Sequence, residues 1–104
     1  MQQVPAYYTT DDVRWKCPDE FKFKVVEAAK EEYGKLGYDL ILVDGVRAER
    51  EDGWALIRAS NTAPQLVMSW EGKTKKAHDE IGAELQDIVA RVMYAMGLEP
   101  GVLA

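Results

Sequence analysis

Seven consecutive residues, 58–64, carry the side chains in this chain that are best suited to binding an anion. Arg58 has a permanently charged, planar guanidinium whose N–H donors match two oxygens of a phosphate or carboxylate at once. Ser60 and Thr62 add hydroxyl donors, and Asn61 adds an amide. In a tight turn, short polar residues also point successive backbone N–H groups into one concavity. The residue types and their spacing therefore favour a loop that binds a tetrahedral oxyanion.

A second interpretation of the same residues is purely structural. Ser, Asn and Pro are common in turns, where their side chains form hydrogen bonds with the neighbouring backbone. Arg58 would then take part in a surface ion pair, which contributes little to stability. The residue types are compatible with both interpretations.

Two segments with period-two alternation flank the loop. In the first segment, one face carries Trp54, Leu56 and Arg58. In the second, every second residue from Leu66 to Trp70 is large and apolar. This alternation is typical of strands with one buried and one wetter face. We expect the loop to join two antiparallel strands.

Four short elements occur in order along the chain: residues 44–47 read DGVR, residues 53 and 54 read GW, residues 58–64 read RASNTAP, and Glu71 follows. This order and spacing resemble the C-terminal domain of the α-D-phosphohexomutases, a family that includes bacterial phosphomannomutase/phosphoglucomutase. The resemblance extends over about residues 8–92. One departure is Ala63, where many members have Glu, while the main donor positions of the loop are all present.

The resemblance implies a parent enzyme that interconverts hexose 1-phosphates and 6-phosphates through a bisphosphate intermediate that turns round in the active site. In such an enzyme a phosphoserine in the first domain transfers the phosphoryl group, a DGDxD-type loop in the second binds Mg²⁺, and a loop in the third reads the sugar. None of these motifs occurs in this sequence. The positions that correspond to Arg58, Ser60, Asn61 and Thr62 bind the phosphate that is not reacting. The chain itself is therefore expected to hold no catalytic residue, metal or cofactor, although Mg²⁺ is implied for the parent enzyme.

We accordingly expect residues 1–104 to form a single domain, the C-terminal domain of a larger mutase, either cut from that enzyme or encoded as a separate subunit. Residues 1–7 are expected to be a linker and residues 98–104 a C-terminal tail. The expected partners are a phosphosugar and the other three domains, with the identity of the sugar read elsewhere. Arg47 and Lys73 are further candidates to approach the ligand, with a solvated face as the alternative for each.

The competing hypothesis is a free-standing, non-catalytic α+β module that binds a small anionic ligand or a protein partner. Composition is compatible with it: the chain has 104 residues, of which 47% are hydrophobic and 30% charged, as in an ordinary globular domain. A net charge of −5 without a basic stripe argues against nucleic-acid binding. No apolar run reaches the roughly 20 residues of a membrane helix, so we expect no membrane partner and a cytoplasmic location. Cys17 is expected to be a buried small apolar residue, and His78 a solvated helix residue.

The patterns along the chain predict an α+β fold of the order β-α-β(4)-α, in which two helices cover one face of an antiparallel sheet. A strand is expected at 11–16, a helix at 19–35, a buried strand at 40–43, its partner at 46–50 and then the hairpin that carries the loop. A second helix is expected after Thr74, ending near Gly97. The apolar stripe expected on the first helix consists of Phe21, Val25, Ala28, Ala29 and Leu36. The resemblance implies the TATA-box-binding-protein-like fold group, and this likeness implies no DNA binding.

Overall fold

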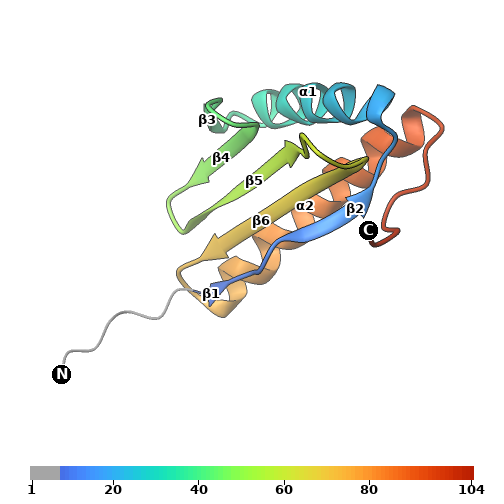
Figure 1. Ribbon diagram of the computed structural model, residues 1–104. Helices are drawn as coiled ribbons and strands as arrows, with labels where there is room; N and C mark the ends of the chain where they lie inside the picture. The colour runs from blue at the N-terminus through green and yellow to red at the C-terminus, as the bar shows by residue number, and fades with distance from the viewer. Residues whose placement is uncertain (1–7) are drawn as a thin grey trace.

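An antiparallel sheet carries two helices on one of its faces in the computed structural model, which describes residues 8–104 (Figure 1). The strands are β1 (Tyr8–Thr9), β2 (Val13–Lys16), β3 (Asp39–Ile41), β4 (Val46–Arg50), β5 (Gly53–Ala59) and β6 (Gln65–Gly72). The helices are α1 (Asp19–Lys35) and α2 (Lys75–Ala95). This order confirms the predicted α+β class; the strand predicted at 11–16 is β2, and the short strand β1 precedes it. The linker expected at residues 1–7 lies outside the described residues.

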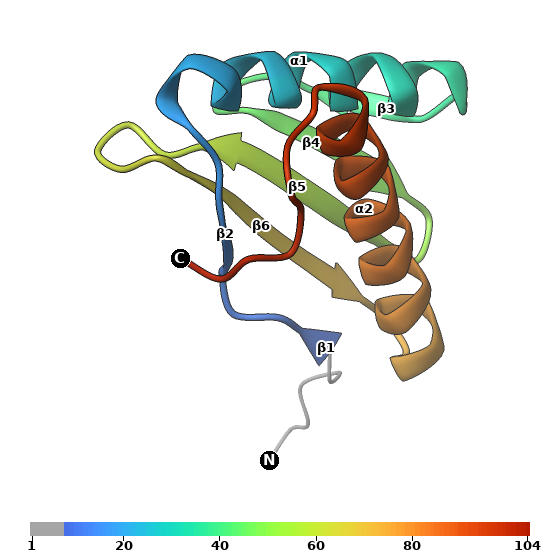
Figure 2. The same ribbon diagram turned by 90° about the vertical axis from the view of Figure 1, so that its right-hand side faces the viewer.

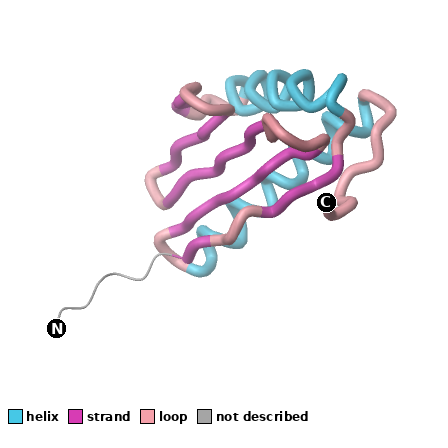
Figure 3. Tube along the Cα trace, viewed as in Figure 1, coloured by secondary structure: helices cyan, strands magenta, loops and turns pink. Residues whose placement is uncertain are grey.

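Strand β6 pairs with three other strands, one along one of its edges and two along the other. The strand order is β1-β6-β5-β4-β3, and β2 also pairs with β6. On one side β5 pairs with β6 from Gly53 opposite Gly72 to Ala59 opposite Leu66. On the other side β1 and β2 follow one another along the same strand, separated by a short loop (Figure 3). The four strands β3 to β6 are antiparallel neighbours in sequence, as predicted.

The core lies between the sheet and the helices, which cover the same side of it (Figure 2). Ala55 and Ile57 of β5 are buried there, while Trp54, Leu56 and Arg58 alternate with them on the half-exposed opposite face. The core side of β6 and the inner side of α2 supply most of the remaining large buried side chains: Leu66, Met68, Trp70, Ile81, Leu85, Ile88, Val89 and Met93. The predicted alternation of the hairpin is confirmed for β5, whereas in β6 Val67, between Leu66 and Met68, is also buried.

Helix α1 has the predicted bounds, and its predicted stripe is confirmed in part: Val25 and Ala29 are buried, and Phe21 and Ala28 pack partly buried against the core. Its buried residues are Lys22, Val25, Ala29 and Tyr33, which follow the spacing of three and four of a helix face. The prediction for Leu36 was wrong, because this residue is 56% exposed. Leu36 is the C-cap residue of the helix, and Tyr33 is the last residue of its buried stripe.

The strand predicted at 40–43 was expected to be buried, and this prediction was wrong. Strand β3 covers Asp39–Ile41 and pairs only with β4, so it forms an edge of the sheet. Ile41 is 45% exposed, Leu42 51% and Val43 89%. A run of four apolar residues is typical of a buried strand only where neighbours cover it on both sides. Here the sheet ends, and the last two apolar residues lie in the turn that leads to β4.

His78 also differs from its prediction as a solvated helix residue. His78 belongs to the first turn of α2, and its side chain is 22% exposed and contacts the β1–β2 connection. One ring nitrogen bonds the Thr10 hydroxyl, and the other lies 3.0 Å from a carboxylate oxygen of Asp79. The ring centroid is 6.0 Å from that of Trp70. His78 therefore attaches the first turn of α2 to the edge of the sheet.

Residues 102–104, the end of the predicted tail, follow the sheet edge formed by β2. The backbone N–H of Lys16 donates to the Val102 carbonyl at 2.7 Å, and that of Ala104 donates to the Arg14 carbonyl at 3.0 Å. Between these bonds, Trp15 and Leu103 form an isolated antiparallel bridge. The predicted tail is therefore bound to the domain, on the side of β2 that faces away from β6. Within residues 8–104, neither helix is long and apolar enough to cross a membrane.

Two helical glycines give a matched test of how closely α2 packs on the sheet. A Cβ at Gly82 would lie 2.4 Å from the Trp70 ring, whereas a Cβ at Gly34 of α1 would meet nothing within 4 Å. We expect Gly82→Ala to lower the free energy of unfolding by about 1–3 kcal/mol through overpacking. Gly34→Ala should raise it by about 0.4–1 kcal/mol, because it lowers the entropy of the unfolded chain. Urea denaturation followed by circular dichroism measures both. A Gly82→Ala variant as stable as wild type would contradict the close packing of α2 on Trp70.

Candidate functional site

The loop predicted from the sequence joins β5 to β6 at one end of the sheet. The Ser60 N–H donates to the Gln65 carbonyl at 3.0 Å, so residues 61–64 form the turn itself. Ser60 is buried, while Asn61 and Thr62 are exposed. Arg58 lies two residues before Ser60 on β5, half-buried on the sheet face that the helices leave uncovered. The structure thus places three of the predicted binding residues in the loop and the fourth at the end of the strand that leads into it.

Ser60 makes one contact that an ordinary polar turn would also make. Its hydroxyl oxygen accepts a hydrogen bond from the Thr62 N–H at 3.3 Å. A hydroxyl that accepts one bond still has its own hydrogen to donate. Ser60 can therefore shape the turn and donate to an anion at the same time.

Arg58 differs from the other arginines of the chain. Arg14, Arg47, Arg50 and Arg91 each lie within 4.0 Å of a carboxylate oxygen. Among residues 8–104, no ion pair or side-chain hydrogen bond involves Arg58. The interpretation of Arg58 as a member of a surface ion pair therefore finds no partner in the described part of the chain. Its guanidinium donors are available for an external oxyanion.

The DGV turn at residues 44–46 packs directly against Arg58. Gly45 has φ +108°, and a Cβ there would lie 2.4 Å from the Ile57 carbonyl oxygen and 2.7 Å from the Arg58 Cβ. Only glycine allows both this backbone conformation and this approach. The turn therefore supports the strand residue that carries the guanidinium, which explains why the two motifs occur together.

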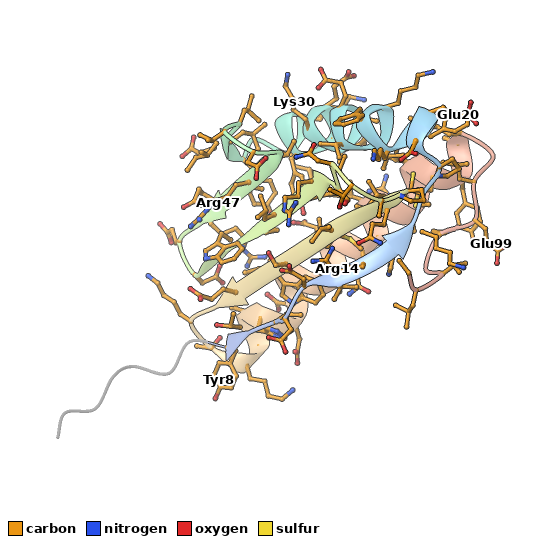
Figure 4. The ribbon with its side chains drawn as sticks, viewed as in Figure 1. Tyr8, Arg14, Glu20, Lys30, Arg47 and Glu99 are labelled. Atoms are coloured by element: carbon orange, nitrogen blue, oxygen red, sulfur yellow. The ribbon has the colours of Figure 1, made fainter. Side chains whose placement is uncertain are left out.

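A hollow of about 230 Å³ opens beside this turn and is lined by Ile41, Val43, Asp44, Arg47, Leu56 and Arg58. The Arg47 side chain, labelled in Figure 4, is 40% exposed and pairs with Glu49. Its guanidinium lies 4.5 Å from the centroid of the Trp54 ring. Lys73 is exposed and lines a neighbouring hollow of about 300 Å³, together with Arg47 and Trp54. Of the two further candidates, only Arg47 shares a hollow with Arg58.

Comparison with known proteins assigns the family of this domain. Residues 13–88 match the family described as "Phosphoglucomutase/phosphomannomutase, C-terminal domain". The chain belongs to this family. The match includes α1, the DGV turn and all of the β5–β6 hairpin with its loop.

Relatives of this phosphohexomutase domain have different names but similar coverage. A probable phosphoglucosamine mutase of Methanopyrus kandleri is 33% identical over 88% of this chain and 20% of its own length. A phosphomannomutase/phosphoglucomutase of Pseudomonas syringae is 35% identical over 77% of this chain and 17% of its own. A phosphopentomutase of Thermococcus kodakarensis is 34% identical over 89% of this chain and 22% of its own length. The chain therefore spans about a fifth of the length of these relatives.

A solved structure has the same fold. The crystal structure of a phosphoglucomutase/phosphomannomutase family protein from Burkholderia thailandensis aligns with 96% of this chain and 20% of its own chain. The TM-score is 0.66 and the sequence identity is 24%. At this identity the likeness supports the fold, and the family assignment depends on the sequence match.

The back of the loop is attached to the start of α1. The ammonium of Lys22 donates to the Ala63 carbonyl at 3.1 Å, and the Cys17 N–H donates to the Pro64 carbonyl at 2.9 Å. Sequence reasoning did not single out Lys22. The spacing of Val25, Ala29 and Tyr33 on the buried stripe would have placed this lysine on the same face.

Cys17 is 1% exposed, which confirms its predicted role as a buried small residue. Burial raises the pKa of the Cys17 thiol above its ordinary value, and the nearby charge of Lys22 acts in the opposite direction. The thiol is therefore held in its neutral, unreactive form at physiological pH.

The contact between Gly45 and Arg58 can be tested with a matched pair of glycines. Gly37 has φ +84°, and a Cβ there would meet nothing within 4 Å, so Gly37→Ala introduces backbone strain alone. Gly45→Ala adds a steric clash, so we expect it to lower the free energy of unfolding by about 1–3 kcal/mol more than Gly37→Ala does. Thermal melts and amide NMR shifts measure the effect, with the largest shifts expected at Ile57, Arg58 and Ala59. Equal losses of stability in the two variants would contradict the packing of the turn on β5.

Proposed function

We propose that this domain binds the non-reacting phosphate of a hexose phosphate through Arg58, Ser60, Asn61 and Thr62. The observation that carries the proposal is the Arg58 guanidinium at the strand end, which has no carboxylate partner among residues 8–104. It lies next to a loop of hydroxyl, amide and backbone donors held in place by β5 and β6. Within residues 8–104 the four other arginines all have carboxylate partners.

In this proposal each group has a distinct role. Arg58 forms two parallel N–H···O bonds with phosphate oxygens and supplies the positive charge. Ser60 and Thr62 donate hydroxyl hydrogens, and Asn61 donates from its amide. These contacts orient the sugar phosphate and supply binding energy remote from the reacting bond, which lowers the barrier by positioning rather than by proton or phosphoryl transfer.

The parent protein is proposed to be a phosphohexomutase that interconverts hexose 1-phosphates and 6-phosphates. The relatives are about five times longer than the chain, which agrees with additional domains that supply the phosphoserine, the Mg²⁺ site and the sugar-reading loop. Residues 8–104 contain no group of three or more His, Cys, Asp or Glu side chains that could hold a metal ion. A cytoplasmic location remains a prediction from the sequence.

The names of the relatives support a domain that recognises phosphate rather than one particular sugar. They refer to glucosamine, to mannose or glucose, and to pentose phosphates, although the identities to this chain are all near one third. The chemical group common to these names is the phosphate. A loop made of one guanidinium and several short donors fits that common group, and we assign the choice of sugar to the rest of the enzyme.

The main test of the proposal is the replacement of the guanidinium by an ammonium. Arg58→Lys keeps the charge but loses the planar pair of donors, so we expect phosphate binding to weaken by about 1–3 kcal/mol. Affinity of the domain alone is expected to be only millimolar, because the sugar and the second phosphate have no partners here. Amide NMR shifts during titration with inorganic phosphate or glucose 6-phosphate measure the binding. The largest shifts should occur at Ser60, Asn61 and Thr62 in wild type.

Arg91→Lys is the matched control, because Arg91 is an exposed arginine on α2, away from the loop. It should bind phosphate as wild type does. If the shifts instead spread over Lys73, Lys75 and Lys76 and are the same in all three proteins, the attraction is diffuse and the loop is an ordinary turn.

A second prediction concerns catalysis by the chain alone. The 104-residue protein should not convert glucose 1-phosphate to glucose 6-phosphate, even with Mg²⁺ and a hexose bisphosphate, because neither a phosphoserine loop nor a metal loop motif occurs in its sequence. A coupled dehydrogenase assay measures turnover, with protein purified from a host that lacks its own mutase. Reproducible turnover in that preparation would overturn the division of labour proposed here.

A further inference from the structure

Lys22 is a charged residue in the interior of the domain. Its side chain is only 7% exposed, and it occupies the stripe of α1 that otherwise carries apolar residues. Burying an ammonium is costly unless hydrogen-bond acceptors surround it. Two acceptors are present: a carboxylate oxygen of Asp19 at 2.8 Å and the carbonyl oxygen of Ala63 at 3.1 Å.

The two partners of Lys22 lie in different parts of the chain, one on the same helix and one in the loop. Asp19 lies three residues away on the same helix and is 71% exposed. This ion pair therefore joins two residues of one helix and attaches no other segment to it. Ala63 lies 41 residues further along the chain, in the loop between Thr62 and Pro64. The ammonium therefore connects the first turn of α1 to the loop that follows β5.

The attachment acts on the back of the loop and leaves its front free. The Ala63 carbonyl also accepts the Gln65 N–H at 2.8 Å, and the next carbonyl, of Pro64, accepts the Cys17 N–H at 2.9 Å. Two adjacent carbonyls are thus held against the domain. Asn61 and Thr62, on the other side of Ala63 in sequence, remain exposed. The loop is fixed at its C-terminal half, while Asn61 and Thr62 face solvent.

We propose that Lys22 is a positioning residue for phosphate binding: its ammonium holds the Ala63 carbonyl, which fixes the loop before the ligand arrives, and it places a positive charge behind the loop. This inference rests on the proposed function of the loop. The charge acts within a chain of net charge −5 and lies in a region that solvent and salt screen less than the surface. Lys22 does not touch the phosphate and acts through the loop backbone.

The stability and phosphate affinity of a Lys22 variant distinguish the proposed positioning role from a purely structural one. Replacing a buried ion pair with apolar side chains is often neutral or stabilising, and because Asp19 is 71% exposed, Lys22→Met leaves no buried charge without a partner. Lys22→Met keeps the length of the side chain and removes both the charge and the donors. We therefore expect Lys22→Met to be at least as stable as wild type while its loop is less ordered and its phosphate binding is weaker.

The experiment compares Lys22→Met with Lys24→Met in the 104-residue chain. Lys24 is an exposed lysine two residues along the same helix, so the control removes the same charge without touching the loop. Backbone ¹⁵N relaxation without ligand reports the order of Asn61 and Ala63, and titration with inorganic phosphate reports affinity. We expect lower order parameters in the loop of Lys22→Met and a dissociation constant raised about tenfold, the scale of one charge-assisted hydrogen bond. Lys24→Met should change either quantity little.

Each outcome decides a separate point. Loop order and affinity in Lys22→Met equal to those of Lys24→Met would overturn the inference. If wild type shows no phosphate-dependent shifts in the loop, the proposed function fails, while the ligand-free relaxation data still decide whether Lys22 fixes the loop. If Lys22→Met does not unfold cooperatively, Lys22→Gln takes its place. Weaker binding than in Lys24→Met then supports the inference, and equal binding overturns it.

Discussion

The pairing of β5 with β6 is the interaction on which the rest of this domain depends. It extends from Gly53 opposite Gly72 to Ala59 opposite Leu66 and ends where the loop begins. Because side chains alternate along a strand, the same register that buries Ile57 in the core places Arg58 on the open face. A slip of one residue would exchange the two. The hydrophobic core therefore determines the face of the sheet on which the Arg58 side chain lies.

This dependence explains how much could be predicted from the sequence. Local patterns of apolar residues, glycine and proline predict the bounds of α1, the partner strand at 46–50 and the hairpin with its loop. The structure has these elements where they were predicted. The exposure of Leu42 and Val43 could not be predicted, because it depends on whether another strand lies beyond β3. The contacts of His78 with Thr10 and of Lys22 with Ala63 join segments that are far apart in sequence. No local pattern contains that information. The binding roles of Arg58, Ser60, Asn61 and Thr62 stay predictions.

Two cations serve the loop in different ways. Arg58 is half-buried on a sheet face, and its planar donors have no carboxylate partner within residues 8–104. Lys22 is buried, and its donors are used by Asp19 and by the loop backbone. In a chain of net charge −5, these are two cationic side chains close to the loop, and a role of either in attracting phosphate stays part of the proposal.

The binding of residues 102–104 along β2 has a consequence for contacts between copies of this domain. A strand at the edge of a sheet presents unpaired N–H and C=O groups that can recruit a strand from another molecule. On β2, the backbone groups of Arg14 and Lys16 on the side away from β6 are already bonded to the chain's own final residues. The opposite edge is β3, which is only 3 residues long. One edge of the sheet is thus covered and the other is short, and this protects the domain from growing into intermolecular β-sheet.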